Sequence, residues 1–307
     1  MPAELDLQQL RAFFLVAQLG SFSGAARRLF RTQSAVSHAV RKLEDSAGLR
    51  LLVRRGRLVR PTEEGLRLTQ ACESIFATLE LAQEDLQKGH TRAAGRLRLG
   101  VTVEFGSSVL LRHIQPFVAA HPGLELDFHL GPELLGPLLR EDIDLAIDCV
   151  NHHVPALERT PLFREAYQVA CAPAYRDALR LRRPADLARC TVLSMDKECA
   201  WWNRFLSAIP KARRPALGRI MAVNHIRGMI NAAVHGLGVV IAPSYSLQSE
   251  LTRGSLVPCF PSIRPLEDWF ALYQKTSKAR LAKHRLLKEY LQGLKVSAFS
   301  SRPSRGG

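Results

Sequence analysis

The segment from Thr32 to Gly48 has the strongest pattern in the chain and constrains what its N-terminal part can fold into. Its apolar residues recur at steps of four, three and four, at Val36, Val40, Leu43 and Ala47. This spacing places them on one face of a helix, where they form a single buried stripe. Thr32 is a good N-cap, and Gly48 can end the helix in a left-handed conformation. The segment therefore predicts one amphipathic helix.

The face opposite this stripe carries hydrogen-bonding side chains of mostly modest length. They are Gln33, Ser34, Ser37, His38 and Arg41. Such donors and acceptors can fit against base edges in a DNA groove. A shorter helix that opens at Ser23 and carries the small Ala25 and Ala26 precedes them across a tight turn. This order predicts a helix-turn-helix in which Ser23, Thr32 and the polar face contact DNA, with an ordinary solvated helix pair as the alternative.

The charge distribution supports binding of a polyanion. Residues 11–60 contain eleven basic and two acidic side chains, so this segment carries +9 of the formal net charge of +15. The 257 residues that lie outside it share the remaining +6. A basic charge concentrated on one small module is typical of phosphate binding, whereas a uniformly basic surface would be weaker support.

The residues that follow Gly48 predict a two-stranded wing. Leu51–Arg54 and Leu58–Arg60 are short strand candidates that are joined by a turn. Its tip carries three basic side chains, Arg54, Arg55 and Arg57. Arginines at a loop tip suit phosphate or minor-groove contact, with a solvated charged turn as the alternative.

Two further helices flank this unit. The first, from Asp6 to Leu19, has capping-box spacing at its start and should brace the helix-turn-helix. The second opens after the N-cap Thr62 and is expected to run to about Lys88. Its apolar residues are spaced four, three, four, three and four apart, at Leu68, Cys72, Ile75, Leu79, Ala82 and Leu86. This seam predicts a coiled coil between two copies of the chain, and packing on its own domain is equally compatible with the periodicity.

The second half of the chain alternates predicted strands and helices. Strands are expected at 96–101, 124–130, 143–147, 167–172, 191–193, 220–223, 239–242 and 269–273, and helices at 107–120, 134–140, 200–208, 226–235, 245–250 and 282–294. This order implies parallel sheets in two lobes with two crossings between them. We predict a DNA-binding domain over 1–61, a linker helix over 62–89, an effector-binding domain over 90–295 (lobe I about 90–164 and 268–295, lobe II about 165–267) and a disordered tail over 296–307.

The ends of these strands nominate a ligand site, because ligands in parallel sheets sit at the carboxyl ends of the strands. Lobe I contributes Thr102, Val103, Glu104, Gly131 and Asp148, and lobe II contributes Lys197, Trp201, Asn224 and His225. Each of these residues could instead cap a helix. The acidic and basic side chains oppose one another, so no effector class is selected.

Cysteine and histidine usage argues against a metal or redox site. The six cysteines are scattered and no CxxC occurs, so reduced thiols are expected. Cys199 lies sixty residues before the next cysteine, Cys259, and we expect a small inert thiol. The pair His152 and His153 has no supporting carboxylate or thiol in sequence and is expected to lie in a solvated loop.

Other sequence features limit the cellular location of the protein and the functional class to which it can belong. No run of about 18 apolar residues occurs, so we expect no membrane partner. Glu4 and Asp6 stand where a signal peptide would be basic, which favours a cytoplasmic protein. No P-loop, GxSxG, HExxH or GxGxxG motif is present, which argues against an enzyme.

The segment from Asp6 to Gly65 resembles the N-terminal domain of LysR-type transcriptional regulators. The resemblance is carried by LQQLRAFFLVAQLGSFSGAARRL, TQSAVSHAVRKLE and GLRLLVRRGRLVRPTEEG, and continues with RLRLGV at 96–101, DLAID at 144–148 and GLGVVIAPSY at 236–245. It implies a bacterial protein that dimerises through the linker helix and often forms tetramers. It also implies a C-terminal part that is similar to periplasmic solute-binding proteins and senses a small molecule. In such regulators the hydroxyl position matched by Thr102 commonly binds effector.

We therefore predict an α/β protein with an N-terminal, all-α winged helix-turn-helix, a long linker helix and a two-lobed, periplasmic-binding-protein-like effector domain. Its predicted function is effector-controlled transcription regulation. The expected partners are promoter DNA, a second copy or a tetramer, a small-molecule effector and RNA polymerase, with no cofactor or metal. A sequence-indifferent architectural DNA binder and an enzyme with a DNA-binding appendage remain as alternatives. A regulator should prefer its operator by ~10³ or more, which separates it from the architectural alternative.

Overall fold

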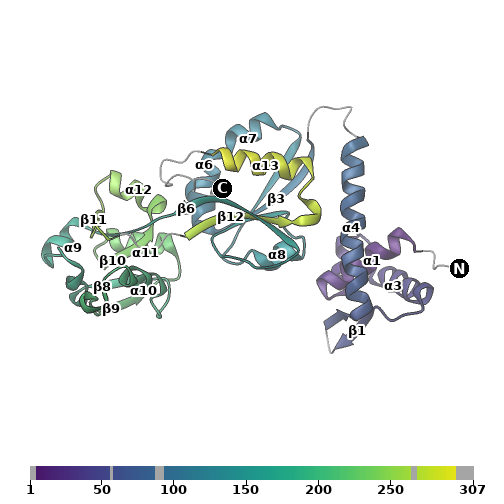
Figure 1. Cartoon of the computed structure of the whole chain (residues 1–307), viewed down its shortest axis with the longest axis horizontal. Helices are drawn as coiled ribbons and strands as arrows, with labels where there is room; N and C mark the ends of the chain where they lie inside the picture. Colours follow the sequence, from purple (N-terminus) through teal and green to yellow (C-terminus); the bar gives the residue numbers. More distant parts are fainter. Residues whose placement is uncertain (1–4, 56–57, 87–92, 264–267, 295–307) are drawn as a thin grey trace.

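A computed structural model describes residues 5–55, 58–86, 93–263 and 268–294 of the chain. Figure 1 shows three parts in a row: a small helical part crossed by one long helix, and two lobes in which helices cover a sheet. The predicted fold class is confirmed in each of these parts. The tail over 296–307 lies outside the described residues.

The N-terminal part contains α1 (Leu7–Leu19), α2 (Phe22–Arg28), α3 (Gln33–Ala47) and a hairpin of β1 (Leu52–Arg55) with β2 (Leu58–Pro61). Local capping sets the helix starts, because the Asp6 carboxylate accepts from the backbone N–H groups of residues 8 and 9, both at 2.9 Å. The predicted start of α2 at Ser23 is wrong by one residue, since the Ser21 hydroxyl accepts from the N–H of Gly24 and the helix begins at Phe22. Gly48 ends α3 at φ +65°, as predicted.

The long helix α4 runs from Glu63 to Leu86 and starts where Thr62 accepts from the N–H of Gly65 at 3.0 Å. Its first half lies against α1. Cys72 is fully buried there, and the Phe76 ring lies 5.5 Å from that of Phe14. The first turns of α4 therefore belong to the core of the N-terminal part.

Lobe I is built on a five-stranded sheet of order β4-β3-β5-β12-β6. Its strands are β3 (Gly95–Val101), β4 (Leu124–Leu130), β5 (Leu145–Asp148), β6 (Leu157–Glu165) and β12 (Asp268–Lys275). Strands β3, β4 and β5 are parallel, whereas β12 pairs antiparallel with β5 and β6. The prediction of a wholly parallel sheet is wrong because the chain leaves the lobe along β6 and returns along β12, which requires opposite directions.

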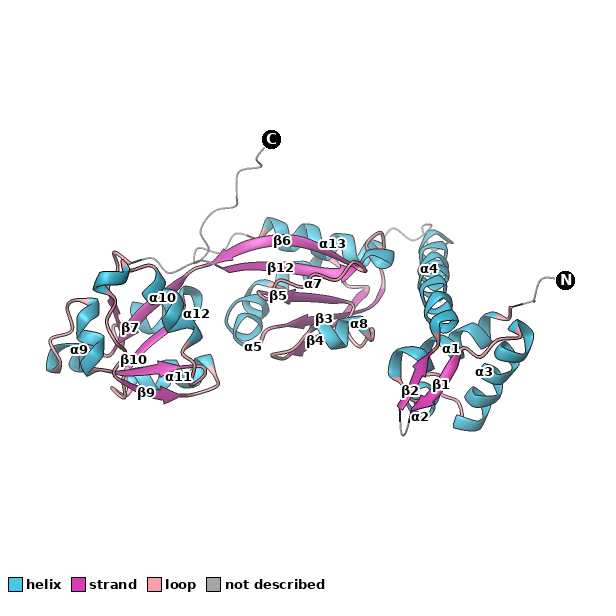
Figure 2. Cartoon of the chain, turned by 60° about the horizontal axis from the view of Figure 1, so that its bottom comes forward, coloured by secondary structure: helices cyan, strands magenta, loops and turns pink. Residues whose placement is uncertain are grey.

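Lobe II has a second five-stranded sheet of order β11-β7-β10-β8-β9. Its strands are β7 (Tyr167–Cys171), β8 (Thr191–Ser194), β9 (Arg219–Ala222), β10 (Val239–Pro243) and β11 (Val257–Cys259). Here too the sheet is mixed, since β8, β9 and β10 are parallel and β7 runs antiparallel to β10 and β11. Figure 2 shows the two sheets joined end to end near β6 and β12.

The helices of lobe I differ from prediction at one place. The helix expected over 107–120 begins earlier, with α5 (Val103–Phe105), and is not continuous: a π-turn (Gly106–Leu110), α6 (Leu111–His113) and α7 (Gln115–Ala120) follow. The break at Ile114 precedes Pro116, which has no N–H to continue the hydrogen-bond ladder. The remaining helices are α8 (Leu135–Leu139), a 3-10 turn (Thr276–Lys278) and α13 (Ala282–Gly293).

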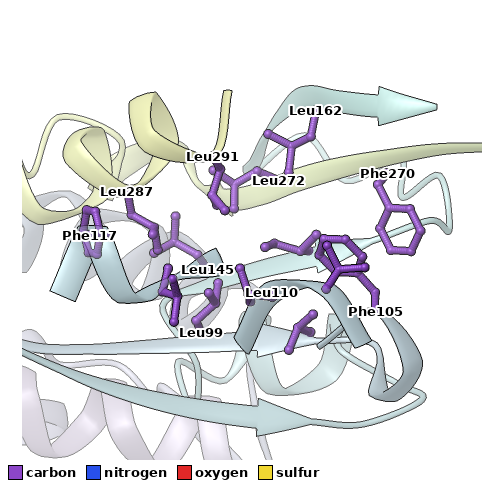
Figure 3. Packing of buried hydrophobic residues seen from close by; sticks show 14 of the residues in the cluster. Leu99, Phe105, Leu110, Phe117, Leu145, Leu162, Phe270, Leu272, Leu287 and Leu291 are labelled. Atoms are coloured by element: carbon purple, nitrogen blue, oxygen red, sulfur yellow. The ribbon is translucent and has the colours of Figure 1, made fainter. Parts of the chain in front are cut away.

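Aromatic and aliphatic side chains fill the space between these helices and the sheet. Figure 3 shows Leu287 and Leu291 of α13 pointing toward Leu272 on the sheet. The ring of Phe105 lies 4.8 Å from that of Phe270, which anchors α5 to the strand that returns from lobe II. This cluster holds the end of β3 in place, and a second, smaller cluster that includes Leu134, Leu138 and Ile143 covers other residues of the same sheet.

Lobe II is covered by α9 (Pro173–Ala178), α10 (Ala200–Ser207), α11 (Ile226–Val234), α12 (Ser244–Thr252) and two 3-10 turns (Pro184–Arg189 and Lys211–Arg213). Trp202 is fully buried, and its indole N–H donates to the carbonyl of Leu193 at 2.8 Å. Among the helices described, none combines the length and the apolar character that crossing a membrane requires.

Candidate DNA-binding and effector sites

The start of the helix-turn-helix is held together by short polar side chains. Thr32 accepts from the N–H of Ala35 at 3.2 Å and thereby caps α3. The hydroxyl of Ser23 on α2 donates to the side-chain oxygen of Gln33 at 2.8 Å. The bond between Ser23 and Gln33 links the first turn of α2 to the first turn of α3, so the N-terminal ends of the two helices lie side by side.

The predicted polar face of α3 lies at the surface. Gln33, Ser34, His38 and Arg41 are exposed, and Ser37 is half-buried at the edge of the face. The buried side of α3 consists of Val36, Val40 and Leu43 together with Glu44. A helix with this division can enter a groove with its polar face while its apolar face holds it to α1.

Glu44 has a role that the sequence reasoning missed. Its side chain is 8% exposed, and one carboxylate oxygen accepts from the backbone N–H groups of Leu51 at 2.8 Å and Leu52 at 3.1 Å. The other oxygen pairs with Arg50 at 3.0 Å. Glu44 therefore fastens the start of the wing to α3. An acidic residue seven positions before an extended strand is the signal in sequence, but it is a weak one.

The wing itself forms as an antiparallel hairpin. Of the arginines predicted at its tip, Arg57 lies outside the described residues, as do the side chains of Arg54 and Arg55. Their contact with DNA stays a prediction.

The predicted effector residues of lobe I lie at the carboxyl ends of its parallel strands. Thr102 is half-buried, and its hydroxyl makes no capping bond to the helix that follows. Val103 is half-buried beside it, and Gly131 is buried and donates its N–H to the carbonyl of Val101 at 3.1 Å. Both Asp148 oxygens are used within lobe I, one by the N–H of residue 150 and the other by His152 at 2.9 Å.

The predicted residues of lobe II lie beyond β8 and β9. Asn224 and His225 are exposed, and the His225 ring accepts from the N–H of Gly228 and caps α11. Lys197 is exposed. Trp201 is half-buried and lies edge-on to the Tyr167 ring at 5.0 Å, which places it beside the crossing between the lobes.

Ion pairs of Arg227 link the predicted effector residues of lobe I to lobe II. Arg227, on the first turn of α11, donates to Glu104 of lobe I at 2.8 Å and to Glu250 of lobe II at 3.0 Å. Glu104 also accepts from Ser108 at 2.7 Å. The carboxyl end of β3 is thus tied to the end of β9. The sequence reasoning counted Arg227 among the charges that oppose Glu104, but did not nominate it as a binding residue or predict this ion pair.

A buried carboxyl group lies where the chain crosses between the lobes. Glu165 is 2% exposed and accepts from the hydroxyls of Tyr167 at 2.7 Å and Tyr245 at 3.0 Å. Burial raises the pKa of Glu165 to about 7, although both hydroxyls act to lower it. Arg204 pairs with Asp268 beside it, at the start of β12. Both crossings therefore pass through one polar cluster.

Comparison with known proteins assigns both halves of the chain. Residues 90–295 match the family model of the LysR substrate binding domain, and residues 7–66 match the bacterial regulatory helix-turn-helix protein, lysR family. This chain belongs to the LysR-type transcriptional regulators. Membership confirms the predicted regulator with a DNA-binding and an effector-binding part, and excludes the enzyme alternative.

Relatives share this organisation over nearly the whole length. The chain is 31% identical over 291 residues to the glycine cleavage system transcriptional activator of Escherichia coli K12, covering 93% of this chain and 92% of that one. A full-length variant of OxyR from Pseudomonas aeruginosa has the same fold, with a TM-score of 0.72 at 19% identity over 98% of this chain and 99% of that one. Full-length LysG from Corynebacterium glutamicum with bound effector Arg has a TM-score of 0.65 at 23% identity, covering 94% and 98%.

The predicted dimer seam of this LysR-type regulator divides into two parts. Cys72 is fully buried and Leu68 is half-buried, both within the protomer's own core. The assignment of Cys72 to a partner surface is therefore wrong for this conformation, because α1 already covers it. Further along α4, Ile75, Leu79, Ala82 and Leu86 are exposed.

Lobe I contacts the DNA-binding part through ion pairs. Lys275, only 4% exposed, pairs with Glu73 of α4 at 2.7 Å, and Lys278 lies 3.6 Å from Glu80. Arg28 at the end of α2 pairs with Asp142 of lobe I at 2.8 Å. Sequence reasoning did not identify these residues, because partners more than a hundred positions apart leave no local pattern.

The remaining candidates prove to be structural. Cys199 is buried in the core of lobe II. The expectation of a solvated loop without a carboxylate partner is wrong for His152, which is half-buried and pairs with Asp148 at 2.9 Å, because the chain folds back after β5; His153 is exposed and lies beside Asn151. Within the described part of the chain, no group of three or more potential ligand side chains could hold a metal ion.

Proposed function

We propose that this regulator binds an interrupted palindrome in promoter DNA as a homodimer, and that a small molecule held between lobes I and II controls its action. The observation that carries the DNA half of the proposal is the exposed polar face of α3, which ends in Arg41 and lies within the most basic segment of the chain. Hydrogen-bonding side chains on this face suit direct readout of base edges, while the surrounding positive charge suits phosphate contact.

The exposed half of α4 supports the dimer. Ile75 and Leu79 are 38% and 39% exposed, and Leu86 is 86% exposed. These side chains continue the heptad spacing and stay exposed although Cys72 and Phe76 are covered by α1, so a second α4 could bury them. Two copies would pair two recognition helices, which matches the two half-sites of a palindrome. A tetramer and a contact with RNA polymerase are further parts of this proposal, as is a cytoplasmic location, where promoter DNA is found.

The Arg227 ion pair supports the effector half. Glu104 is buried and Arg227 is one-third exposed, so a ligand that enters beside Thr102 would meet a charge network that spans both lobes. A ligand that replaces one of these partners would change the preferred spacing of the lobes, because it would bind one arrangement more tightly than the other. Thr102, with its uncommitted hydroxyl, is our first candidate for contact with this ligand.

The contacts of lobe I with α2 and α4 offer a route from the effector to the DNA. Arg28 is held by Asp142 and by the backbone carbonyls of residues 140 and 141. An arginine engaged in this way is not available for a DNA phosphate. A shift of lobe I that broke this contact would release Arg28 and change the orientation of the helix-turn-helix relative to α4.

The DNA half is tested by incubating the purified full-length protein with sheared genomic DNA and excess nonspecific competitor, and then sequencing the retained fragments. Enrichment of an interrupted palindrome supports the proposal. Arg41→Ala should reduce the preference for that site over random DNA by ~5- to 100-fold, which corresponds to one lost base contact. Lys42→Ala is the matched control, because it removes a neighbouring exposed cation that lies off the centre of the predicted readout face. It should weaken binding to all DNA sequences by the same factor. Equal effects of the two variants would overturn the readout assignment.

The effector half is tested separately with metabolite pools. Reporter expression from the enriched promoter should respond to at least one pool, and Thr102→Val should blunt that response while affinity for the palindrome is unchanged. A Thr102→Val protein with an unaltered response would move the effector site away from the end of β3.

A further inference from the structure

Two cysteines that are far apart in the sequence meet at the edge of lobe II. The Sγ atoms of Cys171 and Cys259 lie 3.4 Å apart, although the residues are 88 positions apart along the chain. Cys171 ends β7 and Cys259 ends β11, which is the edge strand of the sheet. In the register of these strands Cys259 lies opposite Val169, two residues before Cys171. Both thiols therefore point to the same face of the sheet.

The pair lies in the core of lobe II, where each thiol has the other as a neighbour and the Cys259 thiol also lies 3.9 Å from the carbonyl of Val257. Cys171 is fully buried and Cys259 is 6% exposed, and both belong to the core of lobe II. Two other buried cysteines of the same core differ in this respect. Cys190 donates its thiol to the carbonyl of Asp186 at 3.3 Å, and Cys199 is buried at the start of α10.

We propose that Cys171 and Cys259 are a thiol modification site at which a hydroperoxide drives formation of a reversible disulfide. A disulfide requires the sulfur atoms at ~2.05 Å, so the two thiols must approach by only a further ~1.3 Å. The edge position of β11 makes this movement feasible, because this strand has three residues and pairs with β7 as its one neighbour in the sheet.

The chemistry assigns different roles to the two sulfurs. The hydrogen bond from Cys259 lowers the pKa of Cys171 despite burial, and the Arg176 guanidinium lowers it further. The same interaction raises the pKa of Cys259. Cys171 is therefore the better source of thiolate and Cys259 is the resolving thiol.

The reaction balances with one hydroperoxide for each disulfide. The Cys171 thiolate attacks a peroxide oxygen, the O–O bond breaks, and the leaving hydroxide or alkoxide takes a proton to become water or an alcohol. The sulfur of Cys259 then attacks the Cys171 sulfenic acid, the S–O bond breaks, and its hydroxyl leaves as water with the proton of the Cys259 thiol. The two sulfurs lose two electrons in total, and the peroxide gains them.

The bond would act on the connection between the lobes. After Cys259 the chain continues toward Asp268, where β12 begins and returns to lobe I. A disulfide would tie this exit to β7, which directly follows the other crossing at Glu165. Oxidation would thus link, within lobe II, the two chain segments that connect the lobes. Because the lobes can move relative to one another only through these two segments, the disulfide would restrict that motion.

The test uses the reduced, full-length protein treated with hydrogen peroxide and mapped by mass spectrometry without reduction. We expect the loss of two titratable thiols, a cross-linked peptide pair that contains Cys171 and Cys259, and recovery of both thiols with dithiothreitol. A disulfide between other cysteines, or irreversible oxidation of Cys171 with no cross-link, would overturn the proposal. This measurement needs no variant and is independent of DNA or effector binding.

Variants sharpen the assignment of roles. Cys259→Ser should abolish the cross-link and leave a sulfenic acid on Cys171 that a dimedone probe captures. Cys199→Ser is the matched control, since it removes a buried thiol from the same core, and it should still lose two thiols and form the same cross-link. Loss of the cross-link in a folded Cys199→Ser protein would also contradict the pairing.

Discussion

Replacing Glu44 tests whether α3 holds the wing in place. In Glu44→Ala the backbone N–H groups of Leu51 and Leu52 lose a charged acceptor at 2.8 and 3.1 Å. A hydrogen bond to a charged group contributes roughly 1.5–3 kcal/mol, and a buried donor left unpaired costs about 1–3 kcal/mol. Because Leu51 is buried and Leu52 is half-buried, only the backbone N–H of Leu52 can readily form a hydrogen bond with water instead. The lost pair with Arg50 adds little, since that side chain is 80% exposed. We expect a loss of about 2–4 kcal/mol.

Hydrogen exchange measured on the full-length protein resolves this effect locally. A loss of about 2–4 kcal/mol should accelerate exchange at Leu51 by roughly 30-fold or more, if exchange reports local opening of the wing. Glu44→Gln keeps one acceptor oxygen and should lose about 1 kcal/mol. Asp45→Ala removes the adjacent exposed carboxylate and should change stability by less than about 0.5 kcal/mol. Equal exchange at Leu51 in the Glu44→Ala and Asp45→Ala proteins would refute the reasoning.

Three further predictions concern assembly and pH. Ile75→Asp or Leu79→Asp should give monomers in analytical ultracentrifugation and weaken binding to a full palindrome; a dimeric double variant that binds fully would exclude the seam. Burial lowers the pKa of His284 to about 3, so the unfolded chain takes up an extra proton below pH ~6.5 and stability falls by about 1 kcal/mol per pH unit. His284→Gln should flatten this slope in thermal melts, whereas the exposed His235→Gln should keep it. Because the pKa of Glu165 is raised to about 7, its contribution is present below pH ~4.5 and lost as pH rises to 7. Glu165→Gln should therefore gain up to about 3 kcal/mol relative to wild type above pH 7 and nothing near pH 4, and equal differences at both pH values would contradict the shift.

Features that depend on neighbours in sequence were predictable. The N-caps Asp6, Thr32 and Thr62 and the end of α3 at Gly48 were all correct, because capping and helix periodicity act over a few residues. The polar face of α3 followed from the same periodicity. The most basic segment of the chain could be located by counting charges, which needs no coordinates.

Strand direction and helix continuity in the effector part were harder to predict. Alternation of strands and helices correctly indicated two lobes, but β6 and β11 were missed and the sheets are mixed rather than parallel. Crossing strands take their direction from where the chain must go next, and the apolar pattern of a strand is the same in either direction. The break before Pro116 shows that a correct amphipathic pattern does not guarantee one continuous helix.

By itself, the sequence determined the helix-turn-helix, the exposed polar face of α3, the charge of this segment and the family to which the chain belongs, since each rests on local spacing or on motifs. Only the tertiary structure decided which distant groups meet. The bond from Glu44 to the wing, the ion pair of Arg227 with Glu104, the contact of Arg28 with lobe I and the thiol pair of Cys171 with Cys259 each join two different elements of the fold. Such pairs require the fold to place the interacting atoms of two segments about 3 Å apart, and no periodicity along the chain encodes that placement.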